Sequence, residues 1–166
     1  MKINFKKVGI ASLLLLITGR AFSKNSPLNF SVLTPKNIIR KCDPFGCGYF
    51  GAGRGSRPHN GLDFTIKEND VIKAPFDSVI TRYGHVYADD NRFQLVEIKG
   101  VNQWRNYTAK VMYIKSLLNV NSNLKKGDFL CRADDITKKF NSKMAIHVHF
   151  ELYKNGKLIN PTPFFK

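Results

Sequence analysis

The sequence predicts an all-β domain built on an antiparallel sheet. Short segments rich in β-branched and aromatic residues, such as 78–83, 93–99 and 107–115, are separated by turn residues. Lys154-Asn155-Gly156-Lys157 predicts a hairpin, because Asn-Gly suits a type I′ turn. The helical candidate at residues 134–143 is weak and the sequence has no internal repeat, which favours antiparallel strands throughout.

Residues 1–23 have the parts of a secretory signal peptide. Three lysines within residues 1–7 precede an apolar run at 8–19 that is too short to span a bilayer. Ala21-Phe22-Ser23 then places small residues at the −3 and −1 positions of a cleavage site. We therefore expect export, to an extracellular space or a bacterial periplasm. Nothing later in the sequence is a transmembrane candidate, and the remainder suits one domain.

The chain is strongly basic. It has 27 lysines and arginines against 12 aspartates and glutamates, a formal net charge of +15. Four basic residues and no acid lie within residues 1–23, so the mature charge is about +11. This charge could serve solubility alone, but it also favours an anionic partner. No arginine-aromatic stacking motif indicates nucleic acid, so we expect an anionic cell-wall polymer, a glycan or a cell-surface receptor.

Residues 24–41 and the cysteines that follow introduce the domain. Residues 24–41 are polar and rich in Asn, Ser and Pro, and they predict a loosely packed lead-in to a domain at 42–166. The turn residues Pro44 and Gly46 suit a small loop, so in an exported chain we expect a Cys42–Cys47 disulfide. Cys131 is then left over, either as a buried thiol or as a handle for an intermolecular bond.

The segments after residue 63 are predicted to be strands joined by turns. The predicted strands cover residues 71–75, 78–83, 93–99, 107–115, 129–131, 145–153 and 158–161. Lys125-Lys126-Gly127-Asp128 is a turn signal before residues 129–131. The glycines between residues 48 and 55 do not predict a phosphate-binding loop, because Pro58 and His59 follow them in place of a helix.

Two stretches carry the residue types of a metal site. His59 and Asp63 flank Gly61, and His147 and His149 alternate with apolar residues in a predicted strand. This alternation places both strand histidines on one face, about 6.6 Å apart. A straight strand would separate His59 from Asp63 by about 13 Å, so the chain must bend, which Gly61 permits. Two histidines and a carboxylate would then form a three-ligand zinc site with its fourth position open for water.

The same residues have simpler interpretations. His59 and Asp63 could be a hydrogen-bonded pair in a surface loop, and His147 and His149 could line the polar face of a strand. The cysteines offer a poorer metal site, because Cys-x4-Cys lacks a second pair. Spacing alone leaves these interpretations open.

The motifs together resemble the lysostaphin-type zinc metalloendopeptidases, metallopeptidase family 23. His59-x-x-x-Asp63 followed by His147-x-His149 is the main point of similarity, with the Lys125 turn in that family's order. Within the family, the chain is most similar to the leukocyte cell-derived chemotaxin branch. The stretches that carry this similarity, within residues 41–165, are Cys42-Asp43-x-x-Gly46-Cys47-Gly48, Arg57-Pro58-His59-x-Gly61-x-Asp63, Ala74-Pro75-Phe76, Met112-Tyr113-Ile114-Lys115 and His147-Val148-His149.

This resemblance implies a lysostaphin-type fold and a Zn²⁺ site with His59, Asp63 and His149 as ligands. His147 would be a non-ligand that handles protons or steadies an oxyanion. Active members carry a further histidine in a Tyr-x-His motif, where this chain has Lys115. Lysine is ordinarily a cation and therefore a poor proton acceptor, although it could stabilise a developing oxyanion.

We therefore expect a secreted zinc-binding, metallopeptidase-like domain with an incomplete catalytic apparatus, which acts by binding a wall polymer, a glycan or a receptor. The alternative is an active zinc metalloendopeptidase that cleaves peptidoglycan cross-bridges, with His147 as base. The feature that separates the two hypotheses is Lys115, and the sequence leaves open whether another residue, such as Tyr113 or Glu151, fills the missing role.

Overall fold

A computed structural model describes residues 28–116 and 118–165, so the predicted signal peptide at 1–23 lies outside the described residues. Every strand pair in this part of the chain is antiparallel, which confirms the predicted all-β class. The strands are β1 (Gly53–Arg54), β2 (Arg57–Pro58), β3 (Leu62–Thr65), β4 (Val71–Lys73), β5 (Ser78–His85), β6 (Gln94–Gly100), β7 (Tyr107–Lys115), β8 (Asn123–Leu124), β9 (Phe129–Ala133), β10 (His147–Lys154) and β11 (Lys157–Ile159). The helical elements of the described part are the 3-10 turns η1 (Asn102–Trp104), η2 (Ile136–Lys138) and η3 (Thr162–Phe164).

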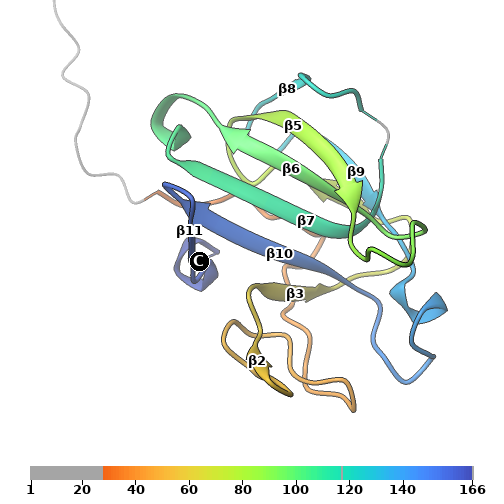
Figure 1. The fold of residues 1–166 in the computed structure, drawn as a ribbon. Helices are drawn as coiled ribbons and strands as arrows, with labels where there is room; N and C mark the ends of the chain where they lie inside the picture. The colour runs from red at the N-terminus through yellow and green to blue at the C-terminus, as the bar shows by residue number, and fades with distance from the viewer. Residues whose placement is uncertain (1–27, 117, 166) are drawn as a thin grey trace, which may run out of the picture.

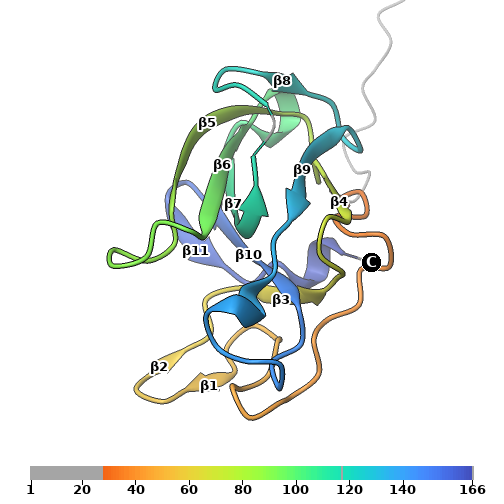
Figure 2. The ribbon, with the colours of Figure 1, turned by 90° about the vertical axis from the view of Figure 1, so that its right-hand side faces the viewer.

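Nine of the strands form one sheet. Its main path runs β11-β10-β7-β6-β5-β8, while β3 also pairs with β10 and β9 pairs with both β4 and β7. Figure 1 shows β5, β6, β7 and β10 side by side as a twisted surface. Figure 2 shows that the sheet curls, so that β4 and β9 lie across from β5 and β6. Within residues 28–116 and 118–165, the structure contains no helix with the length and apolarity needed to cross a bilayer.

Apolar residues that alternate along the central strands build the core. Val96, Ile98, Val111, Phe150 and Leu152 are all fully buried on the inner face of β6, β7 and β10. The residues between them therefore point to the opposite face of the sheet.

The described part of residues 24–41 is not the loosely packed lead-in that its composition predicts. The Phe30 ring lies 4.9 Å from that of Phe164 and 5.3 Å from that of Trp104, and Leu33 is 0% exposed. Phe30 and Leu33 insert into the core, whereas Val32 and Ile38 of the same segment are half exposed. Polar composition alone hides such packing, because burial of one or two large side chains is enough to hold a segment in place.

Local turn chemistry is confirmed where its signal is strong. Asn155 and Gly156 have positive φ values of 51° and 75°, as a type I′ hairpin between β10 and β11 requires. The weak helical candidate at residues 134–143 forms only the short turn η2, with Asp135 as its cap. Strand β3 was missed, because its sequence also contains the buried polar residue Asp63.

Gly61 is required by the close approach of two chain segments. A Cβ at this position would lie 2.3 Å from the backbone oxygen of Phe150 and 2.8 Å from the ring of His149. The φ of Gly61 is outside the left-handed region, so space, and not a special backbone conformation, explains the glycine. Only a residue without a side chain lets β3 begin directly beside β10.

We predict that Gly61→Ala lowers the free energy of unfolding by roughly 1–3 kcal/mol, because the new methyl group overpacks against backbone. Gly53→Ala is the matched control, since a Cβ at Gly53 would meet no atom within 4 Å. It should change stability by less than about 0.5 kcal/mol. Urea denaturation of the two variants measures the difference, and equal midpoints would contradict this account.

Candidate metal centre

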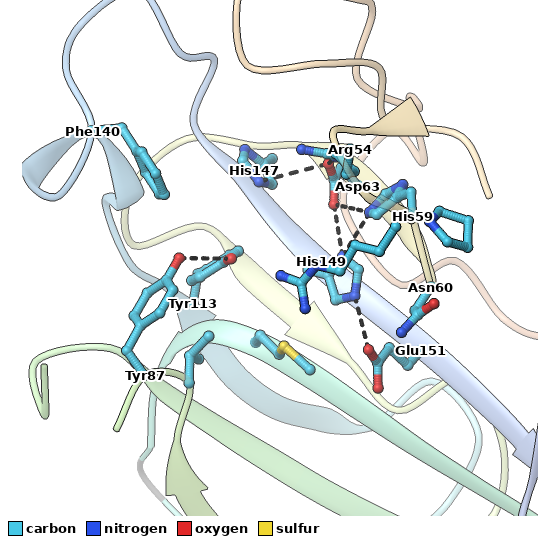
Figure 3. Close-up of a pocket in the computed structure, with 14 residues that line it drawn as sticks. Arg54, His59, Asn60, Asp63, Tyr87, Tyr113, Phe140, His147, His149 and Glu151 are labelled. Carbon is cyan, nitrogen blue, oxygen red and sulfur yellow. Dashed lines mark hydrogen bonds and ion pairs between the residues drawn. The ribbon is translucent and has the colours of Figure 1, made fainter. Parts of the chain in front are cut away.

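The three predicted ligands converge, with His59 and His149 both facing one oxygen of Asp63. Asp63 Oδ1 lies 3.0 Å from His59 Nε2 and 2.9 Å from His149 Nδ1, and the two nitrogens are 2.9 Å apart. All three side chains are buried, and their ligand atoms lie within 4.8 Å of one another. Figure 3 shows the two imidazoles and the carboxylate facing each other at the base of a pocket.

Strand pairing produces this convergence. Strand β3 runs antiparallel to β10 with Asp63 directly opposite His149, so both side chains leave the same face of the sheet. His59 precedes β3 and is fixed by two backbone hydrogen bonds, one from its amide to Ala52 and one from the Gly51 amide to its carbonyl, each 2.8 Å. The bend that the sequence requires between His59 and Asp63 is therefore the passage from this loop into β3.

The hydrogen bonds of the two imidazoles suit a divalent metal ion. His59 Nδ1 lies 2.9 Å from the Tyr49 carbonyl oxygen, and His149 Nε2 lies 3.4 Å from Glu151 Oε1. Each ring can carry its proton on the nitrogen that faces an acceptor, which leaves a lone pair on the nitrogen that faces Asp63. A His₂Asp donor set with one open side is a common zinc arrangement, so the residues present fit this ion.

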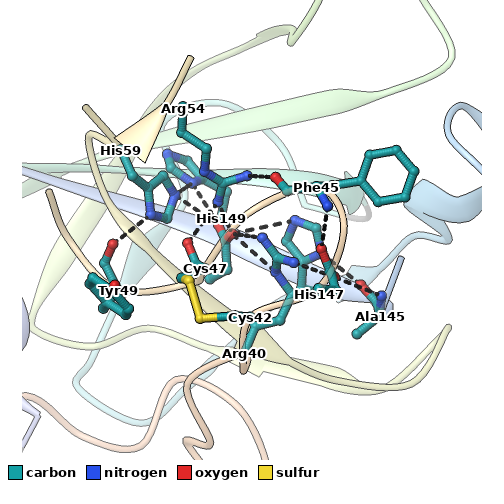
Figure 4. Close-up of polar contacts among 12 residues, drawn as sticks. Arg40, Cys42, Phe45, Cys47, Tyr49, Arg54, His59, Ala145, His147 and His149 are labelled. Carbon is teal, nitrogen blue, oxygen red and sulfur yellow. Dashed lines mark hydrogen bonds and ion pairs between the residues drawn. A yellow bond between two sulfur atoms is a disulfide. The ribbon is translucent and has the colours of Figure 1, made fainter. Parts of the chain in front are cut away.

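Two arginines hold the other oxygen of Asp63. Arg54 donates to Asp63 Oδ2 at 2.6 Å and Arg40 donates to it at 3.0 Å, and Arg40 also pairs with Asp43. Figure 4 shows the two arginines reaching toward the histidines from opposite sides. Burial alone would raise the pKa of the Asp63 carboxyl, but without a metal ion the contacts with His149 and His59, whose rings can then donate to it, lower this pKa well below its ordinary value. Asp63 is therefore an anion with one oxygen directed at the histidines and the other neutralised.

The predicted disulfide organises these arginines. Cys42 and Cys47 are bonded, with an S–S distance of 2.02 Å. Arg54 donates to the carbonyl oxygens of Phe45 and Cys47, inside the loop that the disulfide closes, at 3.0 and 3.1 Å. Cys131 is a buried free thiol whose pKa is raised by burial. It is therefore not available for an intermolecular bond.

A cavity of about 400 Å³ opens above the three ligands. Asn60 lies on one side of it and Tyr87, Tyr113 and Phe140 lie on the other (Figure 3), and Arg57 also lines it. Both polar groups and aromatic surface therefore face the space where a ligand would approach the candidate metal position.

His147 lines the same cavity without joining the three ligands. Its Nδ1 donates to the Ala145 carbonyl oxygen at 2.7 Å, and its Nε2 lies 3.8 Å from Asp63 Oδ2. Burial lowers the pKa of the His147 imidazole, although the charge of Asp63 opposes this. The ring is therefore neutral near pH 7, with its Nε2 lone pair available to accept a proton.

A bulge in β7 turns Tyr113 into the cavity. Met112 is paired with Leu95 of β6 and Ile114 with Gln94, so Tyr113 has no partner on β6 and adopts a φ of 65°. The extra residue shifts the alternation, which places Ile114 in the core and Tyr113 beside His147, with ring centroids 5.4 Å apart. The Tyr113 hydroxyl lies 3.1 Å from that of Tyr87.

Lys115 lies outside this cavity. Its ammonium donates to Glu68 at 2.7 Å and to Asn69 at 3.1 Å, and it lies 3.7 Å from Asp134. The side chain is 39% exposed. The structure therefore brings His59, Asp63, His147 and His149 together but directs Lys115 to a surface ion-pair cluster.

Sequence reasoning missed three residues that shape the site. Arg40, Arg54 and Tyr87 belong to segments with no chemical motif, and their spacing from Asp63 and Tyr113 follows no secondary-structure period. The one signal for Arg54 in the sequence is its position between the predicted disulfide and the metal motif, which are close together along the chain. Tyr113 was considered, but its direction depends on the bulge, which the alternation of β7 does not reveal.

Comparisons with known proteins agree with this geometry. The profile described as peptidase family M23 matches residues 57–161. Leukocyte cell-derived chemotaxin-2 of Mus musculus is 30% identical over 124 residues, which cover 74% of this chain and 78% of the relative. The Bos taurus protein of that name is 30% identical over 129 residues, 77% of this chain and 80% of the relative.

A solved structure extends the similarity to the fold. The antimicrobial peptidase lysostaphin from Staphylococcus simulans superimposes with a TM-score of 0.58 at 19% identity. The superposition covers 84% of this chain and 54% of the lysostaphin chain. The lysostaphin-type fold expected from the motifs is thus confirmed.

We predict that Arg40→Met destabilises the protein by about 3–5 kcal/mol, because it leaves Asp43 without its buried cationic partner and Asp63 with Arg54 alone. Arg40 is only 1% exposed, whereas its exposed neighbour Lys41 makes no comparable contact among the described residues. Lys41→Met is therefore the control, with an expected change below about 0.5 kcal/mol. Equal losses in guanidinium denaturation would show that the buried ion pairs are not the cause.

Proposed function

The chain belongs to peptidase family M23, and on this basis we propose that it is a secreted zinc-binding domain that recognises an anionic wall polymer, a glycan or a cell-surface receptor and hydrolyses peptide bonds slowly or not at all. The single observation that carries this proposal is the set of three convergent ligands beneath an open cavity, with Lys115 directed away from it.

His59, Asp63 and His149 are the residues that would hold zinc. When bound, zinc supplies Lewis-acid polarisation of a carbonyl oxygen and activation of water. The residues of the chain itself add one proton acceptor, the Nε2 of His147, whose other nitrogen is committed to Ala145. His147 is thus the general base candidate of the site.

Among the described residues, the site lacks a second side chain that can accept a proton. Burial and the neighbouring Tyr87 raise the pKa of the Tyr113 hydroxyl well above its ordinary value. Tyr113 therefore remains protonated near pH 7 and acts as a hydrogen-bond donor. Since Lys115 is engaged with Glu68 and Asn69, the site binds a carbonyl group better than it processes one.

The charge of the chain supports an anionic partner, and its chemistry supports export. The formal net charge is +15, and Arg57 adds a cation at the rim of the cavity. The Cys42–Cys47 disulfide suits an oxidising compartment, as does the signal-peptide pattern of residues 1–23.

An active zinc endopeptidase that cleaves peptidoglycan cross-bridges is the second candidate. The neutral His147 and the hydroxyl of Tyr113 both face the cavity, so a base and an oxyanion donor are present together. This candidate requires Tyr113 to serve in place of a second imidazole.

We predict that the purified full chain binds about one zinc ion per molecule, because three ligands leave one tetrahedral position open. Elemental analysis after dialysis checks the ratio. The double variant His59→Ala, His149→Ala should retain no zinc, and removal of zinc from the native protein by chelator should lower its Tm. Equal zinc contents for the native protein and the double variant would exclude this metal site.

We predict that the full chain sediments with insoluble peptidoglycan in a salt-sensitive manner but releases few new amino termini from it. A missing acid–base group typically costs about 10²–10⁴-fold in rate. Rapid, chelator-sensitive release by the native protein would favour the second candidate.

Two substitutions test at which position the second proton acceptor is missing. Tyr113→His should raise the rate, because the bulge directs this side chain into the cavity and histidine tolerates a positive φ. Lys115→His is the matched control and should leave the rate unchanged, because its side chain points to Glu68. Activation by Lys115→His alone would contradict the placement of these two residues.

A further inference from the structure

The outward face of β10 carries a chain of hydrogen bonds that ends on His149. His149, Glu151 and Tyr153 alternate along the strand and so share one face. His149 Nε2 lies 3.4 Å from Glu151 Oε1, and the Tyr153 hydroxyl donates to Glu151 Oε2 at 2.6 Å. Figure 3 shows Glu151 on the opposite side of the His149 ring from Asp63.

Glu151 is well shielded for a carboxylate on an outer face. It is 8% exposed and lies opposite Lys110 of β7, whose ammonium is 4.8 Å from the centre of the Tyr153 ring. Both carboxylate oxygens have a partner on β10 itself. Glu151 also lines the cavity, but because both of its carboxylate oxygens are already engaged, it is well placed to support its neighbour His149.

The two histidine ligands differ in the group behind them. His59 is oriented by a neutral acceptor, the backbone carbonyl of Tyr49. His149 is oriented by the Glu151 carboxylate, which is an anion and therefore a stronger acceptor. A carboxylate behind a ligand imidazole fixes its orientation and increases its basicity.

We propose that Glu151, held in place by Tyr153, is a positioning residue of the metal centre. Its carboxylate accepts a hydrogen bond from Nε2 of His149 and thereby directs Nδ1 of that ring toward His59 and Asp63. This inference rests on the proposed zinc site. Partners of this kind typically change metal affinity by about 10–100-fold.

Glu97 provides a matched control. It lies on β6, opposite Lys110 from the other side, and pairs with Arg82 at 3.2 Å. Glu97 and Glu151 therefore share the same lysine neighbour across the sheet, but only Glu151 contacts a predicted metal ligand. A general effect of charge on this face would appear equally at both positions.

The test is a Zn²⁺ competition titration of the full chain against a chromophoric chelator. Glu151→Leu should bind zinc about 10–100-fold more weakly than the native protein, and Glu151→Gln should lie between them, because an amide still accepts a hydrogen bond but carries no charge. Tyr153→Phe should lose less than Glu151→Leu. Glu97→Leu and Glu97→Gln should stay within about twofold of native affinity, because partly exposed ion pairs contribute little.

Cobalt loading gives a second readout. The d–d absorption of bound Co²⁺ reports ligand geometry, and it should change in Glu151→Gln but not in Glu97→Gln, even if Glu151→Leu does not fold. Native-like affinity and spectrum in Glu151→Gln, or an equal loss in Glu97→Gln, would overturn the positioning role alone. Failure of the native protein to bind zinc would overturn the metal site and this inference with it.

Discussion

The Asp63 carboxylate is the point on which the site and its surroundings depend. A buried carboxylate is costly unless each oxygen is satisfied, and here the two oxygens have separate partners. One faces His59 and His149, and the other accepts hydrogen bonds from Arg40 and Arg54. The same charge thus attracts the metal ligands into one place and ties them to the disulfide loop.

The arginines and Glu151 act on the candidate metal centre in opposite senses. Arg40 and Arg54 neutralise part of the negative charge of Asp63, which makes its carboxylate a weaker metal ligand. Glu151 instead places negative charge behind the His149 ring. Neither the arginines nor Glu151 would touch the ion, and each would act through the ligand that it contacts. On the proposed metal site, affinity would accordingly depend on these three side chains as well as on the three ligands.

The β7 bulge decides what kind of chemistry faces the cavity. Without the extra residue, strand alternation would send Tyr113 to the core and Ile114 outward. With it, a protonated phenol stands beside His147, and Lys115 leaves toward Glu68 and Asp134. One irregular residue therefore decides which side chains of β7 face the cavity.

Local periodicity and turn chemistry are enough to predict the all-β class, the β10–β11 hairpin and the Cys42–Cys47 disulfide. The residues that meet at the site were predicted through the resemblance of their motifs to a known family, because spacing alone left other interpretations open. The contacts of Arg40 and Arg54, the direction of Tyr113 and the position of Lys115 become clear only in the folded structure. These depend on strand register and on contacts between segments such as Arg40 and Asp63, 23 residues apart. Register is set by the packing of the whole sheet, so a short window of sequence does not contain it.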